Sequence, residues 1–182
     1  MSDRYSTTAI ALHWLIALAI IGAFPLGLYM SGLPLSPWKL RLYSYHKWIG
    51  ISVLACALLR LLWRAGHRPP PPLAGQPHWQ IVLAEAVHGG LYLLIVAVPL
   101  SGWLMSSALG FPVVLFAVLP LPDLIAKDKV LGESLKAVHE ILNYTLLTLF
   151  AAHVAGALKH HFIDRDATLR RMSPFPGDRE KP

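Results

Sequence analysis

Charged residues are scarce in this sequence, and their scarcity excludes an ordinary soluble domain. Only 14% of the 182 residues are Asp, Glu, Lys or Arg, whereas 55% are hydrophobic. Soluble domains carry about 25% charged residues. Charge is missing altogether from three long runs, 7–38, 86–122 and 141–158. Because a bilayer core accommodates roughly 20 apolar helical residues, lipid is the expected solvent of these runs.

Cysteine is almost missing as well, and so are acidic residues inside the apolar segments. The single Cys56 excludes a disulfide framework or a thiolate metal cluster within one chain. The sequence has no C-x-x-C-H motif, which excludes a covalently attached c-type haem. Near the interiors of the apolar segments the only acids are Glu85 and Glu140, both close to segment ends. This argues against a proton-coupled transporter, which ordinarily carries membrane-embedded carboxylates.

The apolar runs predict an all-α integral membrane protein, a four-helix bundle forming one domain over residues 1–182. The first run contains His13 and Pro25 and lacks a small-residue cleavage pattern, so we expect it to remain in the mature protein. The segment 108–126 is apolar but broken by prolines, and we expect it to lie at the outer interface. Residues 174–182 are expected to form a solvated tail. The four spans are expected at about 8–29, 41–63, 81–105 and 134–159.

The distribution of Lys and Arg predicts that both termini are cytoplasmic. The side of the termini holds ten cations, namely Arg4, Arg60, Arg64, Arg68, Lys159, Arg165, Arg170, Arg171, Arg179 and Lys181. The other side holds six, namely Lys39, Arg41, Lys47, Lys127, Lys129 and Lys136. Cytoplasmic loops carry the excess of cations in membrane proteins. Membrane lipid is therefore a partner, and no nucleic acid partner is expected.

Four histidines lie inside the predicted spans, and two of them share one helix face. His139 and His153 begin and end the stretch HEILNYTLLTLFAAH. Fourteen helical residues advance about 21 Å and leave the two side chains roughly 40° apart. In the four-span topology His46 lies at the depth of His139, and His13 at the depth of His153. Two depth-matched pairs result, one toward the outside and one toward the cytoplasm.

Two stacked haems require this arrangement, in which imidazoles from different helices hold each iron. Two axial histidines leave no open position on the iron, so such a centre carries electrons. Two other interpretations stay open at this point: histidines that hydrogen-bond between the helices of a transporter, and a carrier of zinc or copper. A zinc site ordinarily gathers three or four ligands at one depth, whereas these histidines divide two and two.

Four stretches of the chain look familiar: RYSTTAIALHWLIAL, YHKWIGISVLACALLRLLWR, AEAVHGGLYLLIVAVPLSGW and VHEILNYTLLTLFAAHVAGALKHHFIDRDATLRRM. Together they resemble the bacterial cytochrome b561 family, from about Arg4 to Met172. The resemblance implies a multi-pass protein of the bacterial inner membrane with two haem b groups. It also implies electron transfer to the quinone pool, in some members from superoxide to ubiquinone. The family's four ligands map onto His13, His46, His139 and His153.

The resemblance gives a possible purpose to histidines beyond the inner pair. His160 is seven residues after His153, an advance of about 10 Å with a rotation of roughly 20°. We expect His160 to hydrogen-bond a quinone carbonyl and to pass a proton, with Lys159 or His161 assisting. The alternative is that the KHH run only anchors the helix among the headgroups. His88, next to two glycines, is expected beside the inner haem and not as its ligand.

The outer cations Lys39, Arg41 and Lys47 flank His46 in a loop without acids. We expect them to contact haem propionates or to steer a small anion such as superoxide toward the outer haem. Ordinary surface solubility is the alternative. A second functional class also stays open, namely a membrane-anchor subunit that relays electrons for a separate dehydrogenase or carrier. The segment 108–126 is then the candidate docking surface, for that partner or another periplasmic electron donor.

Overall fold

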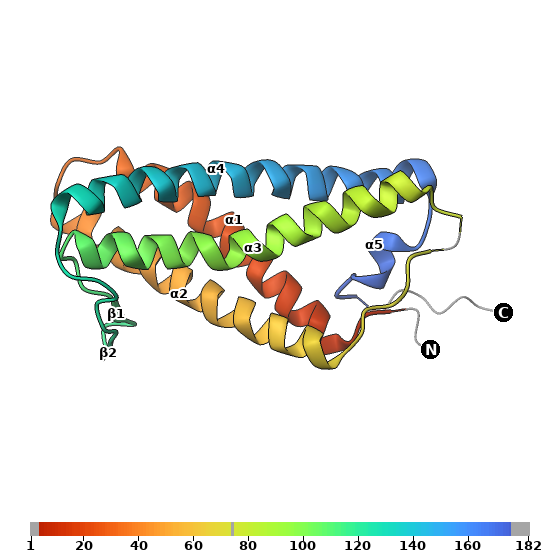
Figure 1. The fold of residues 1–182 in the computed structure, drawn as a ribbon, viewed down its shortest axis with the longest axis horizontal. Coiled ribbons are helices and arrows are strands. Elements are labelled where there is room, and N and C mark those ends of the chain that lie inside the picture. The colour runs from red at the N-terminus through yellow and green to blue at the C-terminus, as the bar shows by residue number, and fades with distance from the viewer. Residues whose placement is uncertain (1–3, 74, 176–182) are drawn as a thin grey trace.

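Four long helices run along the length of the molecule (Figure 1). The computed structural model describes residues 4–73 and 75–175. Each predicted span lies within one of the long helices, and all four helices are long and apolar enough to cross a membrane. The predicted all-α four-helix bundle is confirmed. The helices are α1 (Thr7–Ser31), α2 (Pro37–Gly66), α3 (His78–Ala108) and α4 (Lys129–Lys159).

Three of the long helices begin at a side chain that accepts a hydrogen bond from a backbone N–H of the first turn. Ser6 accepts from Ala9 and Ser36 accepts from Lys39, while Asp128 accepts from two N–H groups of α4. Such capping satisfies donors that have no partner inside the helix, and each cap stabilises it by about 1 kcal/mol. The sequence therefore sets where these helices start.

Two glycines allow α3 and α4 to approach each other closely. A Cβ at Gly90 would lie 2.6 Å from the side chain of Leu149, and a Cβ at Gly132 would overlap the side chain of Leu109. Small residues of this kind are typical where helices pack inside membranes. The helix α1 packs on α2, which in turn packs on α3. A small core at the centre joins all four helices through Ile16, Val53, Ala57, Leu94, Ile95, Val98 and Leu146.

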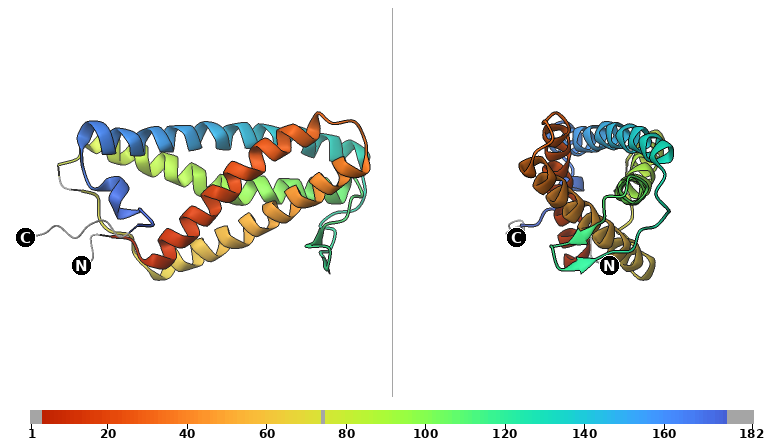
Figure 2. Two further views of the ribbon diagram at one scale, coloured as in Figure 1. Left: turned by 180° about the vertical axis from the view of Figure 1, so that it is seen from behind. Right: turned by 90° about the vertical axis from the view of Figure 1, so that its left-hand side faces the viewer.

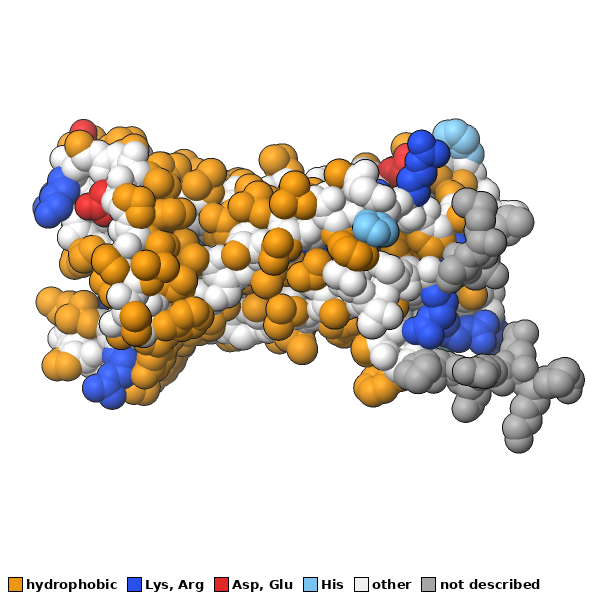
Figure 3. All heavy atoms as spheres, turned by 90° about the horizontal axis from the view of Figure 1, so that it is seen from below, with side chains coloured by type: hydrophobic (Ala, Val, Ile, Leu, Met, Phe, Trp, Pro, Cys, Tyr) orange, Lys and Arg blue, Asp and Glu red, His pale blue; other side chains and the backbone are white. Residues whose placement is uncertain are grey.

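Apolar side chains also cover the outside of the bundle. Leu18, Leu93 and Ile141 are each more than half exposed, although they lie near the middle of their helices. On the face shown in Figure 3, hydrophobic side chains extend along the molecule and the charged side chains gather at its two ends. This distribution matches a bilayer, in which apolar side chains face lipid and charges remain near the headgroups.

The segment between α3 and α4 forms a short hairpin, which the sequence did not predict. Its strands β1 (Val114–Leu115) and β2 (Leu119–Pro120) are antiparallel. The turn residues Phe116 and Ala117 have φ of 51° and 61°, a conformation usually signalled by Gly or Asn. Trp48 of α2 donates a hydrogen bond from Nε1 to the carbonyl oxygen of Val114, at 2.7 Å. We call this end of the bundle the hairpin end.

At the opposite end, α1 and α2 diverge from α3 and α4 (Figure 2). There α4 continues into a π-helical turn, η1 (His160–Asp164), and the chain then forms the short helix α5 (Thr168–Arg171). Trp14 donates a hydrogen bond to the carbonyl oxygen of Met172, at 2.9 Å. We call this end the α5 end. Of the predicted tail 174–182, all but residues 174 and 175 lie outside the described residues.

Candidate functional site

The four predicted histidines come together in two pairs. Near the hairpin end, the ring centroids of His46 from α2 and His139 from α4 are 6.4 Å apart, with the rings at 88° to each other. Nearer the α5 end, the rings of His13 from α1 and His153 from α4 are 6.0 Å apart, at 70°. The structure therefore pairs these residues as their predicted depths require.

The spacing within each pair fits two imidazoles bound to one iron ion. A metal–imidazole bond is about 2 Å long, and the ring centre lies roughly 1 Å beyond the bonded nitrogen. Two imidazoles on opposite sides of an ion are therefore roughly 6 Å apart between their centres. Both observed separations, 6.4 Å and 6.0 Å, agree with this value.

Hydrogen bonds fix the tautomer of His139 in a form suited to metal binding. Its Nδ1 lies 3.1 Å from the carbonyl oxygen of Val98 and 2.9 Å from Oγ of Ser101. Ser101 donates its own hydroxyl proton to the carbonyl oxygen of Val98, at 2.7 Å. The proton between Ser101 and His139 must therefore be carried by Nδ1 of His139, which donates it. The lone pair is then on Nε2. A ligand histidine in a metalloprotein ordinarily donates its other ring N–H in this way.

The Nδ1 atom of His46 is buried without a hydrogen-bond partner among the described residues. The backbone of Ala23 nevertheless interacts with this imidazole, so the ring is not isolated from the protein. The ring packs on the backbone of Gly27, where a Cβ would lie 3.2 Å from Cε1 of His46.

The outer pair lines an apolar cavity of about 270 Å³ between the four helices. This volume is close to that of the smallest ligand pockets, about 300 Å³. Apart from His46, His139 and Asn143, its lining residues are apolar, namely Ile20, Ile21, Ala23, Phe24, Pro25, Gly50, Val53, Ile95, Val98, Pro99, Leu146, Leu147 and Phe150. The apolar lining suits a porphyrin ring, and the two histidines that line the cavity suit its metal ion.

The inner pair has a third histidine beside it. The ring centroid of His88 lies 5.2 Å from that of His153, closer than the 6.0 Å of His13. This separation between the His88 and His153 rings is shorter than the roughly 6 Å expected between two imidazoles that bind one ion from opposite sides. His88 is also an exposed residue. The ring spacing therefore favours His13, and the ligand roles stay predictions.

Two arginines lie next to the inner histidines. Arg60 donates to the carbonyl oxygen of Ala9 at 2.7 Å and to the hydroxyl of Tyr92 at 3.2 Å. The guanidinium groups of Arg60 and Arg64 lie 5.6 Å and 5.3 Å from the centre of the Tyr92 ring. The charge of Arg60 also acts on the inner histidines. From the sequence, Arg60 was counted among the cations on the side of the termini, although an arginine in an apolar run is itself a signal of function.

The outer cations are held largely by backbone carbonyls. Lys39 donates to the carbonyl oxygen of Leu33 at 2.5 Å, and Lys47 donates to that of Phe111 at 3.0 Å. Arg41 is exposed. Lys39 and Lys47 thus lie in the first half of α2 and contact the loops at the hairpin end. Their predicted contact with haem propionates remains a prediction.

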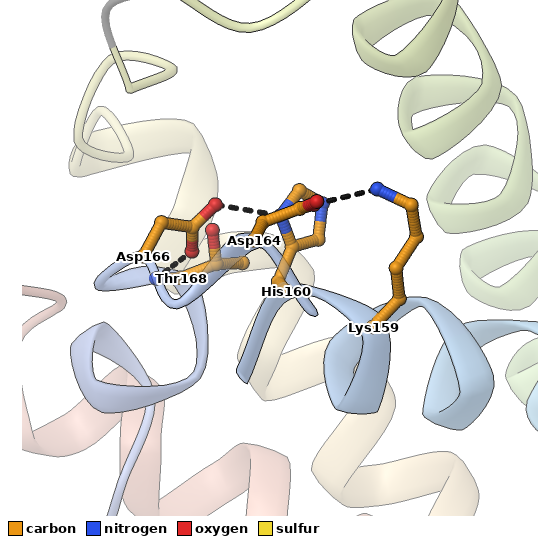
Figure 4. Close-up of polar contacts among 5 residues, drawn as sticks. All are labelled: Lys159, His160, Asp164, Asp166 and Thr168. Atoms are coloured by element: carbon orange, nitrogen blue, oxygen red, sulfur yellow. Dashed lines mark hydrogen bonds and ion pairs between the residues drawn. The ribbon is translucent and has the colours of Figure 1, made fainter. Parts of the chain in front are cut away.

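His160 belongs to a polar cluster at the α5 end (Figure 4). Its Nδ1 lies 2.7 Å from Oδ2 of Asp166 and 3.2 Å from Oδ2 of Asp164, while Lys159 binds the latter oxygen at 2.6 Å. From the sequence we predicted His160 and Lys159 but not the two carboxylates, although both belong to the DRD run that follows HHFI. His161 is exposed and contacts Phe162 instead, with the ring centroids 4.7 Å apart.

The carboxyl group of Asp166 is stabilised in its ionised form. Partial burial alone would raise its pKa, but the hydrogen bonds from Thr168 and His160 outweigh burial, so that the pKa of Asp166 lies below its usual value. The backbone N–H of Thr168 donates to Oδ1 of Asp166, at 2.8 Å. The second oxygen, Oδ2, contacts His160.

Comparison with known proteins agrees with this geometry. Residues 4–175 match the family model described as prokaryotic cytochrome b561. The chain is 37% identical over 171 residues to cytochrome b561 homolog 2 of Escherichia coli strain K12, covering 93% of this chain and 91% of that protein. It is 31% identical over 182 residues to the probable superoxide oxidase CybB of Yersinia pestis, covering 96% and 98%.

A further relative, cytochrome b561 homolog 1 of Escherichia coli strain K12, is 31% identical over 183 residues, which cover 94% of this chain and 98% of that protein. The match over nearly the whole chain implies binding of haem b, electron transfer and a multi-pass location in the bacterial inner membrane. This chain belongs to the prokaryotic cytochrome b561 family.

Proposed function

We propose that this protein carries electrons from the periplasmic side of the inner membrane to the quinone pool, with superoxide as donor and ubiquinone as acceptor. In the balanced reaction, two superoxide anions and one quinone take up two protons and give two oxygen molecules and one quinol. The two histidine pairs, with ring separations of 6.4 Å and 6.0 Å, are the observation that carries the proposal. The donor is suggested by the probable superoxide oxidase of Yersinia pestis, a relative of this chain.

Four histidines would hold two b haems, one per membrane leaflet. His46 and His139 would hold the outer haem, and His13 and His153 the inner haem. When bound, each haem would supply reversible one-electron chemistry, which amino-acid side chains do not offer at ordinary potentials. With two imidazoles each, the haems would have no position for a further ligand, which would favour electron transfer over oxygen binding. The pairs are separated along α4 by about 21 Å, so they provide two steps across the bilayer.

Arginine and lysine side chains would support these sites electrostatically. The excess of Lys and Arg on the side of the termini supports a cytoplasmic position for both, so the hairpin end would face the periplasm. Arg41 is exposed there and would attract a small anion, with Lys39 and Lys47 adding positive charge around it. At the inner pair, the Arg60 guanidinium would neutralise haem propionates.

The quinone would bind at the α5 end beside His160. This imidazole would hydrogen-bond a quinone carbonyl and deliver a proton to it, because reduction to quinol needs protons as well as electrons. Lys159 would assist by holding Asp164 in place, as its ion pair at 2.6 Å indicates. His160→Ala is expected to leave both haems bound and to slow quinone reduction; loss of a haem in this variant would contradict the assigned role.

Purified protein tests the proposal directly. The reduced-minus-oxidised spectrum is expected to show sharp bands of low-spin b haem, with two haems per chain. A colourless preparation containing zinc or copper would instead indicate a metal carrier. Under a steady flux of superoxide, the protein alone is expected to reduce a short-chain ubiquinone, and a requirement for an added protein would contradict the self-contained enzyme.

A relay subunit for a separate dehydrogenase or carrier is the second candidate function. It is favoured by the exposed apolar tip of the hairpin, where Val118 is 83% exposed and Phe116 58% exposed. A protein donor docking at this end would cover these side chains. Charged substitutions such as Val118→Lys would then slow electron entry from that partner and leave superoxide oxidation unchanged.

A further inference from the structure

The polar cluster at the α5 end contains a carboxylate and an imidazole in direct contact. Oδ2 of Asp166 lies 2.7 Å from Nδ1 of His160, and both side chains are largely shielded, with 23% and 18% of their surfaces exposed. The other carboxylate oxygen of Asp166, Oδ1, accepts a hydrogen bond from the backbone N–H of Thr168, at 2.8 Å. Asp166 is thus held on both sides, and one of its oxygens is directed at His160 (Figure 4).

We propose that Asp166 is the positioning residue that orients His160 for proton delivery to the quinone. The inference rests on the proposed function of His160. A carboxylate at Nδ1 keeps the proton of the neutral ring on that nitrogen and leaves Nε2 to exchange protons with a bound quinone. It also stabilises the ring while both nitrogens carry a proton. Carboxylates position catalytic histidines in this way in other enzymes.

The backbone after α4 is shaped so that Asp166 returns to His160. The turn η1 is wider than an α-helical turn, and the residue after it, Arg165, has a φ of 53°. A non-glycine residue in this left-handed region is uncommon. The N–H groups of Arg165 and Asp166 both donate to the carbonyl oxygen of His160. This reversal, and not a continuing helix, brings a residue six positions later onto the His160 ring.

Asp164 does not offer the same contact. Its Oδ2 is 3.2 Å from Nδ1 of His160 and only 2.6 Å from the ammonium of Lys159. The charge of Asp164 is therefore largely paired with Lys159, whereas Asp166 has no lysine or arginine among its contacts in the described residues. Asp166 is consequently the stronger partner of the imidazole.

The test compares two electron acceptors that differ in their need for protons. Protein reduced anaerobically with stoichiometric dithionite is mixed rapidly with a short-chain ubiquinone or with ferricyanide, and oxidation of the haems is followed by absorption. Asp166→Asn is expected to slow oxidation by the quinone about tenfold or more, which is part of the roughly 10²–10⁴-fold that acid–base catalysis contributes. Oxidation by ferricyanide, which takes up no proton, is expected to remain unchanged, as is the haem content.

Glu85→Gln is the matched control, because it removes one exposed negative charge near the start of α3, at the same end of the bundle. It is expected to behave as the unsubstituted protein with both acceptors. Asp166→Ala with added formate or acetate provides a second measurement, since a small carboxylate binding in the space left by the side chain is expected to restore part of the rate.

Three results would overturn the inference: equal slowing with both acceptors, loss of a haem from Asp166→Asn, or a quinone rate in that variant equal to that of the unsubstituted protein. Failure of the proposed function would look different. In that case the unsubstituted reduced protein would itself react with ferricyanide but not with the quinone.

Discussion

The imidazole of His139 packs directly on the backbone of Gly102 in α3, where a Cβ would lie only 3.0 Å from Cε1 of the ring. His46 has the same relationship to Gly27 of α1, at 3.2 Å. Both rings of the outer pair are therefore supported by a glycine on a helix other than their own. These contacts fix how far each imidazole projects toward the other.

Gly102→Ala is expected to displace His139 and to weaken the outer haem selectively. The added methyl group is closer to the ring than ordinary van der Waals contact allows, so the ring must move away from its present position. Ligand geometry at metal sites tolerates little displacement, and we expect the haem content to fall from two per chain toward one. A pyridine haemochrome assay with protein quantification measures this ratio. Gly22→Ala is the control, since a Cβ there meets nothing within 4 Å; equal haem loss in both variants would contradict the prediction.

Single substitutions of the four paired histidines are expected to divide into two classes. His13→Ala and His153→Ala should each remove or alter the inner haem, and His46→Ala and His139→Ala the outer one, because the structure pairs them in this way. Low-temperature spectra and redox titration distinguish the two centres. A variant of one pair that alters only the haem assigned to the other pair would show that the pairing is wrong.

His88→Ala is expected to keep both haems, although the His88 ring lies 5.2 Å from His153. Its separation is too short for a ligand on the opposite face of the same iron, which requires roughly 6 Å. The bis-histidine spectrum should therefore persist, with at most a small change in the midpoint potential of the inner centre. Loss of the inner haem in His88→Ala together with its retention in His13→Ala would exchange the two assignments.

Arg60→Leu is expected to loosen the inner haem about tenfold, the effect of losing one hydrogen bond to a charged group. The guanidinium connects α1 to Tyr92 of α3 and lies beside the inner histidines. The rate of haem transfer to an excess of apomyoglobin measures this change. Arg68→Leu is the control, because Arg68 is exposed in the connector after α2. Similar rates for both variants would exclude a specific role of Arg60.

The stability of the turn after α4 should depend on the ionisation of Asp166. Because its pKa in the folded protein lies below the ordinary value of 3.8, the ionised carboxylate favours the folded turn. The stabilisation is complete above a pH of about 4 and is lost as the pH falls through the folded-state pKa. Hydrogen exchange of residues 160–172, corrected for intrinsic rates, should be slower than in Asp166→Asn at pH 6. The difference should shrink as the pH falls below the ordinary pKa of 3.8, and a difference that does not shrink would contradict this origin.

The presence of the four helices and the depths of the histidines could be predicted from residues close together in the chain. Apolar runs long enough for a bilayer predicted the four helices, because a buried backbone in lipid must satisfy its own hydrogen bonds. The regular rise of the helix placed His139 and His153 two-thirds of a membrane apart on one face. Both features depend on residues close together in the chain, and the structure contains all four helices and both pairs.

The remaining features depend on contacts between distant residues. The support of His139 by Gly102, the return of Asp166 to His160 and the contact of Arg60 with Ala9 each join separate segments. A sequence shows depth along a helix, but not the rotation of one helix against another. The choice between His13 and His88 illustrates this, since both lie at the depth of His153 and are distinguished by their ring distances and their exposure.

The sequence by itself determined that the chain spans a membrane with four helices and that histidines lie at two levels, because hydrophobicity and helical rise act locally. The tertiary structure decided which rings face each other, which glycines support them and which carboxylate reaches His160. These outcomes depend on how side chains from separate helices fill one shared space.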